Sequence, residues 1–141
     1  MGVDQLRDAA NTAYNDNRLY APAGNNAMEY YLALRDKQPG DAGASRALSD
    51  PLPMAVIATE QSIGREDFVE AQRRSALIEK ADPKAPALPR LKQTIAAAQL
   101  AVTARAETEK TKAVTDAEAK VLEEKRLAQQ AEQQRVAAEA L

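Results

Sequence analysis

The sequence contains neither cysteine nor histidine among its 141 residues. Their absence excludes disulfides, thiolate nucleophiles and imidazole bases, together with the commonest zinc and copper ligands. Because most catalytic chemistry relies on one of these groups, we expect no enzyme, no catalytic residue, no metal site and no cofactor. The missing cysteines are compatible with any redox compartment, so they indicate no location in the cell.

Long apolar runs and an excess of basic residues are also missing. The most apolar stretch, Pro53 to Ala58, is far shorter than the roughly 20 residues that a membrane-spanning helix needs, so we predict no membrane insertion by this segment. Basic and acidic residues number 12 and 13 up to Ala101, and 7 and 8 beyond it. Nucleic-acid binding requires a basic face that releases counterions from phosphates, so we predict none.

Helical periodicity dominates the first part of the chain. Apolar residues three and four positions apart predict helices over 4–18 and 27–37, which are separated by a loop that contains Pro22 and Gly24. Either Asn25 or Asn26 could cap the second helix, because a short side-chain oxygen accepts hydrogen bonds from the amides of a first turn. A further short helix is expected within 41–50.

The next two segments predict the interior of the domain. Residues 52–63 are apolar on most sides, which predicts a buried helix at the centre of the core, with Gly64 at its C-terminal end. Glu66 and Asp67 then favour the start of a helix that continues to Asp82. Its predicted inward face consists of Phe68, Ala71, Ser75, Leu77 and Ile78.

The last part of the chain predicts one long helix. No glycine or proline occurs from Arg90 to Leu141, so a helix of about 50 residues, roughly 75 Å long, is possible. Large apolar residues become sparse after Thr103, while charged pairs such as Glu123 with Arg126 have the spacing that supports an exposed helix. We therefore predict an all-α fold with a helical bundle over 4–101, followed by an extended polar helix or linker over 102–141.

The spacing within 102–141 leaves two states of association open. Val114, Val121 and Ala128 lie seven residues apart, as in a coiled coil, but the alternate positions include Glu124. Because this seam is poor, a lone solvated helix is the favoured interpretation. Weak self-association comes second, so we expect a monomer or a weak homodimer through the tail.

All four tyrosines lie in the first part of the chain, at Tyr14, Tyr20, Tyr30 and Tyr31. Exposed tyrosines often bind partners, because they bury a large area with little loss of entropy. We expect Tyr14 and Tyr31 to pack between the first two helices. Tyr20 and Tyr30, in a loop and at a helix edge, are the candidate residues for binding a protein partner.

A weak internal repeat relates residues 27–41 to residues 71–85 at an offset of 44 positions. The repeat matches Ala27 with Ala71, Leu34 with Ile78, and Pro39 with Pro83. The run GREDFVEAQRRSALIEKADP at 64–83 resembles the second helix of a tetratricopeptide repeat, with its turn glycine, aromatic residue and terminal proline. This resemblance implies a tetratricopeptide-like bundle of helical hairpins.

A wider resemblance concerns the cell envelope. The runs RLYAPAGNNAMEYYLALRDKQPGD at 18–41 and PMAVIATEQSIGREDFVEAQRRSALIEKADPKAPALPRLK at 53–92 resemble the periplasmic helical region of TonB-type energy transducers of Gram-negative bacteria. The run over 103–141, which is rich in alanine, glutamate and lysine or arginine, is similar to the long helical middle of TolA-type proteins. The TonB-type resemblance implies a periplasmic, non-enzymatic spacer or scaffold in an inner-membrane-anchored transport protein, which spans the envelope and binds a protein partner.

Two further expectations complete the sequence-based picture. The chain shows only the middle of such a transducer, and Met1-Gly2 resembles a cloning remnant, so we expect an excised fragment. The alternative function is an oligomerising adaptor, in which the helical tail self-associates while the bundle binds a peptide.

Overall fold

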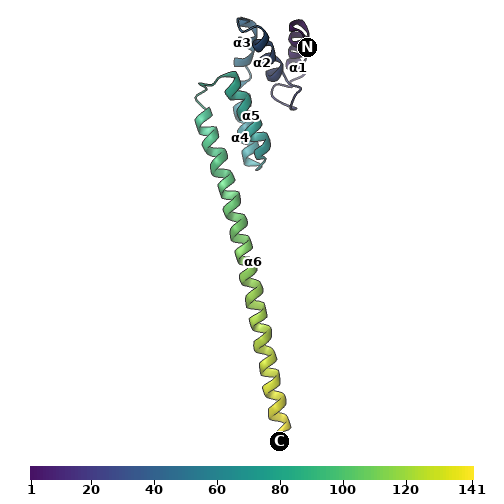
Figure 1. The fold of residues 1–141 in the computed structure, drawn as a ribbon, viewed down its shortest axis with the longest axis vertical. Coiled ribbons are helices and arrows are strands. Elements are labelled where there is room, and N and C mark those ends of the chain that lie inside the picture. Colours follow the sequence, from purple (N-terminus) through teal and green to yellow (C-terminus); the bar gives the residue numbers. More distant parts are fainter. The chain divides into compact units, whose positions relative to one another are not determined.

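The computed structural model describes residues 1–141 and is built from helices alone (Figure 1). The six helices are α1 (Val3–Asn15), α2 (Ala27–Lys37), α3 (Ala42–Ser49), α4 (Leu52–Gly64), α5 (Phe68–Ala81) and α6 (Leu88–Glu139). The predicted all-α fold is confirmed, and so is the long final helix, which has 52 residues. The tetratricopeptide-like arrangement of the hairpins stays a prediction.

Three of the helices begin at a side-chain cap. The carboxylate or amide oxygen of the cap accepts a hydrogen bond from the backbone amide three residues later, which satisfies a donor that the helix itself leaves unpaired. These bonds run from Glu29 to Asn26 at 3.0 Å, from Ala44 to Asp41 at 2.9 Å, and from Glu70 to Asp67 at 3.3 Å. Asn26 is therefore the cap of α2, rather than Asn25.

The helices α1 and α4 end in the same way. Asn17 and Glu66 adopt left-handed backbone conformations, with φ of 61° and 60°. The amide that follows each of them donates to a carbonyl five residues back, at 2.8 Å after Asn17 and 2.9 Å after Glu66, which is the Schellman termination. Gly64 was expected to mark the end of α4. It is the last helical residue, but the left-handed position lies two residues later.

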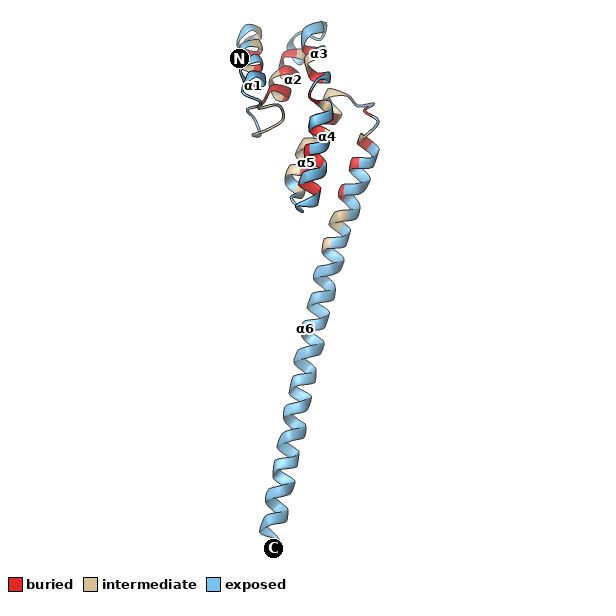
Figure 2. Cartoon of the chain, turned by 180° about the vertical axis from the view of Figure 1, so that it is seen from behind, coloured by how far each residue is buried: buried red, intermediate tan, exposed pale blue.

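Burial differs sharply along α6. Leu88, Leu91 and Ile95 are buried, as their spacing predicted, whereas every residue from 103 to 141 is exposed (Figure 2). The predicted ion pair between Glu123 and Arg126 forms, at 2.6 Å. None of the six helices combines the length and the apolarity that crossing a bilayer requires.

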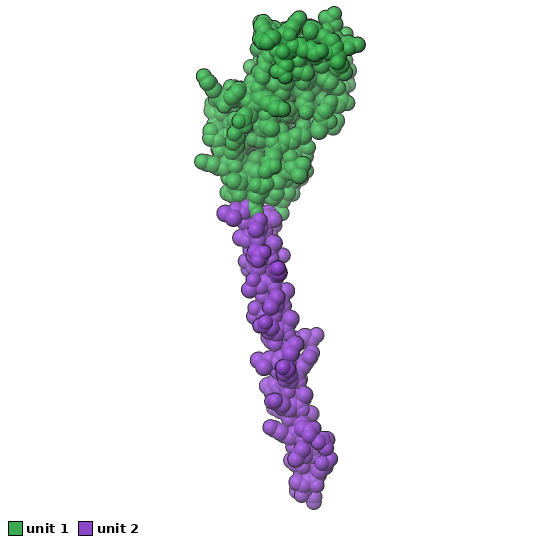
Figure 3. All heavy atoms as spheres, in the orientation of Figure 1, with its two compact units in different colours: residues 1–99 green, residues 100–141 purple.

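The chain divides into two compact units, Met1–Gln99 and Leu100–Leu141 (Figure 3). Unit 1 contains α1 to α5 and the first part of α6, and unit 2 contains the remainder of α6. The sequence suggested a domain boundary between residues 101 and 102, and this boundary stays a prediction.

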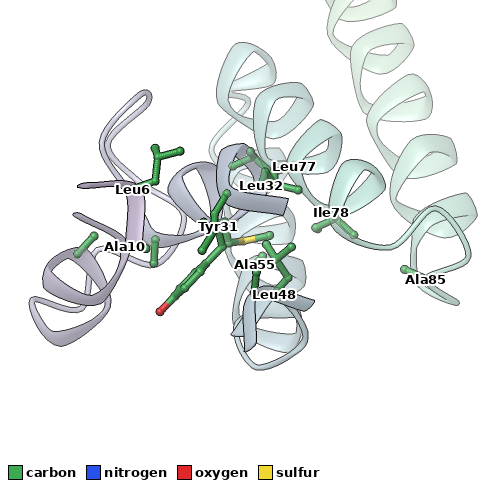
Figure 4. Packing of buried hydrophobic residues seen from close by; sticks show 14 of the residues in the cluster. Leu6, Ala10, Tyr31, Leu32, Leu48, Ala55, Leu77, Ile78 and Ala85 are labelled. Carbon is green, nitrogen blue, oxygen red and sulfur yellow. The ribbon is translucent and has the colours of Figure 1, made fainter. Parts of the chain in front are cut away.

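The core of unit 1 joins side chains from successive helices (Figure 4). Its largest fully buried apolar side chains are Met28, Leu34, Leu48, Ile78 and Leu91. Burying a side chain of this size contributes about 1.5–3 kcal/mol. The cluster therefore fixes α2, α3, α5 and the start of α6 within one unit.

The helix α4 does not form the centre of this core, contrary to the sequence-based expectation. Met54 and Ile57 are 50% and 52% exposed, while Ala55 is fully buried. The side of α4 that is buried carries mainly small residues, Ala55, Ala58, Thr59 and Ser62, together with Ile63 near its C-terminal end. Small side chains let α4 and α5 approach closely, while Met54 and Ile57 remain on the exposed side.

Candidate partner-binding surfaces

The loop between α1 and α2, residues 16–26, is held firmly against the first turn of α2. The amides of Ala27 and Met28 donate to the carbonyls of Arg18 and Leu19, at 2.7 and 3.0 Å. The Glu29 carboxylate accepts bonds from the Gly24 amide and the Asn26 side chain, both at 2.5 Å, and Asn26 is fully buried. Because buried polar groups need partners, this network ties the loop to α2.

The two tyrosines predicted to bind a partner, Tyr20 and Tyr30, border this loop and are half-buried. Both pack against the main core cluster. The Tyr30 hydroxyl donates to the Asn25 side chain at 2.8 Å, and the Arg74 guanidinium lies 5.0 Å from the centre of the Tyr20 ring, within the range of a cation–π contact. Each tyrosine therefore has an intramolecular contact, and partner binding by them stays a prediction.

The other two tyrosines, Tyr14 and Tyr31, differ in burial. Tyr31 is 8% exposed, and its hydroxyl donates to Asn11 at 2.8 Å. Burial raises the pKa of Tyr31. Tyr14 is 41% exposed, so the prediction that it packs between α1 and α2 is wrong. The buried face of α1 is centred on Leu6, Ala10 and Ala13, and Tyr14 lies at the edge of that face.

A network of charged side chains on α5 joins α4 to the loop. Arg74 donates to the Ala58 carbonyl and the Ser62 hydroxyl, both at 3.0 Å, and to the Glu70 carboxylate at 3.0 Å. The same guanidinium faces Tyr20. Since Arg74 contacts α4, α5 and the loop before α2, it is a positioning residue for the surface that contains Tyr20.

The neighbouring Arg73 shares the same carboxylate. It makes two hydrogen bonds to Glu70, at 2.7 and 2.9 Å, and hydrogen bonding by Arg73 is the main reason why the pKa of Glu70 is lowered. The remaining terminal nitrogen, Nη1 of Arg73, is buried and has no hydrogen-bond partner. An unpaired buried donor is costly, so this nitrogen weakens the net contribution of Arg73 to stability.

Two grooves on unit 1 offer candidate binding surfaces. The groove between α2 and α5 encloses about 470 Å³ and has mixed charges, and the groove between α5 and the first part of α6 encloses about 290 Å³ and is more apolar. The first is lined by Glu29, Leu32, Ala33, Arg35, Asp36, Leu77 and Lys80. The second is lined by Gln72, Ser75, Ala76, Glu79, Lys92, Ile95, Ala96 and Gln99.

Charged side chains in both grooves are engaged within the chain. In the α2–α5 groove, Arg35 donates to the carbonyls of Lys80 and Ala81 at the end of α5, at 2.6 and 3.1 Å. In the α5–α6 groove, Lys92 and Glu79 form an ion pair at 2.8 Å. No group of three or more histidine, cysteine, aspartate or glutamate side chains is placed to hold a metal ion.

The sequence revealed only part of this arrangement. Glu70 lies three and four residues before Arg73 and Arg74, a spacing that predicts ion pairs on one helix. The hydrogen bonds from Arg74 to Ala58 and Ser62 could not be predicted from the local sequence, because they depend on how α4 and α5 pack. The contact between Arg74 and Tyr20 could not be predicted for the same reason.

Comparisons with protein-family models, with curated protein sequences and with solved structures find no match to this chain. The class that the structure itself defines is an all-α protein with a helical bundle and a long final helix.

Proposed function

We propose that the chain is a non-enzymatic scaffold and spacer, in which unit 1 binds a protein partner and unit 2 sets a distance. The observation that carries the proposal is the exposure of every residue from 103 to 139 within one unbroken helix. An unbroken helix holds a fixed length even where none of its side chains is buried in a core. The 40 residues from Leu100 to Glu139 correspond to about 60 Å.

The helix of unit 2 is stabilised by the helix propensity of its residues and by local ion pairs, because its side chains are not buried. The stretch is rich in alanine, glutamate, lysine and glutamine, which are the strongest helix formers. Arg135 pairs with Glu132 at 2.5 Å and with Glu139 at 2.8 Å, and Arg126 pairs with Glu123 at 2.6 Å. Such pairs at helical spacing each add about 0.2–0.5 kcal/mol.

The resemblance to TonB-type transducers and TolA-type proteins extends the proposal to a cellular setting. The spacer would act in the periplasm, as part of an inner-membrane-anchored energy transducer that spans the envelope. Tyr20 and Tyr30, beside the fixed loop, are the proposed contacts for the partner. The full gene tests this part of the proposal. An encoded N-terminal membrane helix and a C-terminal receptor-binding domain would support it, and a cytosolic polypeptide lacking both would refute it.

The spacer role is tested by a distance within one chain. Because the chain has no cysteine, Ala104→Cys and Ala137→Cys allow two spin labels to be placed without background. A continuous helix predicts a narrow separation of roughly 50 Å, whereas a flexible coil predicts a broad distribution near about 32 Å. Dilution with unlabelled chain removes any signal between molecules, and a broad, short distribution would refute the spacer.

A second candidate function is the oligomerising adaptor, in which the tail pairs with another copy while unit 1 binds a peptide. The observation in its favour is a set of exposed apolar side chains in unit 2, among them Val114 at 54%, Val121 at 49% and Leu122 at 70%. The two functions are compatible, because a helix that pairs weakly keeps its length.

A further inference from the structure

One face of the helix in unit 2 combines apolar side chains with two opposite charges. At 3.6 residues per turn, its six members lie within an arc of about 100°. We call it the 114–129 face, and it consists of Val114, Glu118, Val121, Leu122, Lys125 and Gln129. Four of these residues also line a shallow groove on the helix surface, together with Ala117.

The charges of this face differ from those beside it. Glu123 and Arg126, on another side of the helix, bind each other at 2.6 Å. Glu118 and Lys125 lie seven residues apart, on the same side of the helix, and neither forms an ion pair within the chain. Each therefore keeps its charge available for a group outside the chain, beside the exposed side chains of Val121 and Leu122.

We propose that the 114–129 face binds the same face of a second copy of the chain, with the two helices antiparallel. A two-fold axis midway between Val121 and Leu122 places Val121 of one copy beside Leu122 of the other. The same axis places Glu118 opposite Lys125 of the second copy, and the symmetry makes this pair twice. Val114 then faces Gln129 of the second copy.

Charge complementarity selects this orientation. In a parallel pair in register, Glu118 would face Glu118 and Lys125 would face Lys125, so both contacts would be repulsive. In the antiparallel pair both become attractive, at the 8–10 Å axis separation that packed helices adopt. Opposed helix dipoles also favour the antiparallel arrangement. The apolar part of the face is short, so the dimer is weak and its share of the chains rises with concentration.

This inference deepens the adaptor function, since it names a second copy as the occupant of the tail. It rests on the helix of unit 2 alone and is independent of the periplasmic role. A helix that keeps its length but remains monomeric would overturn the pairing and leave the spacer intact. A coil in place of the helix would overturn both.

Charge reversal tests the pairing in the full chain by sedimentation equilibrium over increasing concentration. Glu118→Lys or Lys125→Glu alone turns two attractive pairs into two repulsive ones and should raise the dimer dissociation constant roughly tenfold. The double variant restores both pairs and should restore the dimer. The matched control is Lys120→Glu, the same chemical change on the opposite side of the helix, which should leave the dissociation constant unchanged.

Cysteine pairing tests the orientation. Val114→Cys in one chain and Gln129→Cys in a second chain of different size, mixed and oxidised, should give mainly the mixed disulfide dimer. Mainly same-size pairs would indicate a parallel dimer and would overturn the proposal. A chain that stays monomeric throughout, or a Lys120→Glu effect as large as that of Lys125→Glu, would overturn it as well.

Discussion

The position of the core within unit 1 can be tested with one substitution made at two places. Ile78 on α5 is fully buried, whereas Ile57 on α4 is 52% exposed. Replacing isoleucine by alanine at a fully buried site costs about 2–5 kcal/mol, because the lost transfer free energy is joined by a cavity. We therefore expect Ile78→Ala to lower the free energy of unfolding of unit 1 by an amount in this range.

The same change at Ile57 should cost far less. About half of the side chain is already in water, so roughly 1 kcal/mol of transfer free energy is at stake. The higher helix propensity of alanine returns about half of that. For a unit of this size each kcal/mol shifts the melting temperature by about 4–8 °C, so the two variants should differ clearly.

The tyrosines supply a probe that is specific to unit 1. The chain contains no tryptophan, and its four tyrosines all lie between residues 14 and 31. Urea unfolding followed by tyrosine fluorescence therefore reports unit 1 without a signal from the helix of unit 2. If Ile57→Ala proved as destabilising as Ile78→Ala, then α4 would lie at the centre of the core, and our description of the packing would be wrong.

Three further predictions concern a charge, a turn and the tail. A hydrogen bond from Arg7, at 2.7 Å, lowers the pKa of Asp41, so the pair stabilises the fold above the ordinary carboxylate pKa and loses this effect as the pH falls through the lowered one. Arg7→Gln should therefore flatten the acid side of the unfolding free energy against pH, and an unchanged slope would contradict this. Asn17→Val places a β-branched residue at φ 61° and should cost about 1–2 kcal/mol in urea unfolding, while Asn17→Gly, the control, should cost nothing. Ala117→Gly should weaken the exposed helix by about 1 kcal/mol, seen as lost far-ultraviolet circular dichroism, while the tyrosine-monitored midpoint of unit 1 should stay unchanged; a shifted midpoint would contradict this prediction.

The helix boundaries were predictable where capping chemistry is local. The helix α2 runs from Ala27 to Lys37, as predicted, because Asn26 caps its start and Pro39 follows its end. The burial of Leu88, Leu91 and Ile95 followed from their spacing in the same direct way. These features depend on a few neighbouring residues, so they can be predicted from the sequence.

Packing between helices was less predictable. The helix α4 is apolar on most sides, so its composition could not say which side faces α5. The small residues Ala55 and Ala58 determine which side of α4 faces α5, because they allow the two helices to approach closely. Met54 is left half-exposed. Among the candidate site residues, the placing of Tyr20 beneath Arg74 depends on that same approach. A contact across 54 positions of sequence has no periodic signature.

The exposure of residues 103–141 has a consequence for how this part of the gene can change. A substitution there disturbs no buried core, so outside the 114–129 face the main requirement on the sequence is that helix propensity be kept. An inserted residue would advance every following side chain by about 100° around the axis and about 1.5 Å along it. Natural selection could therefore adjust the length of the tail in small steps, without selecting a new interior each time.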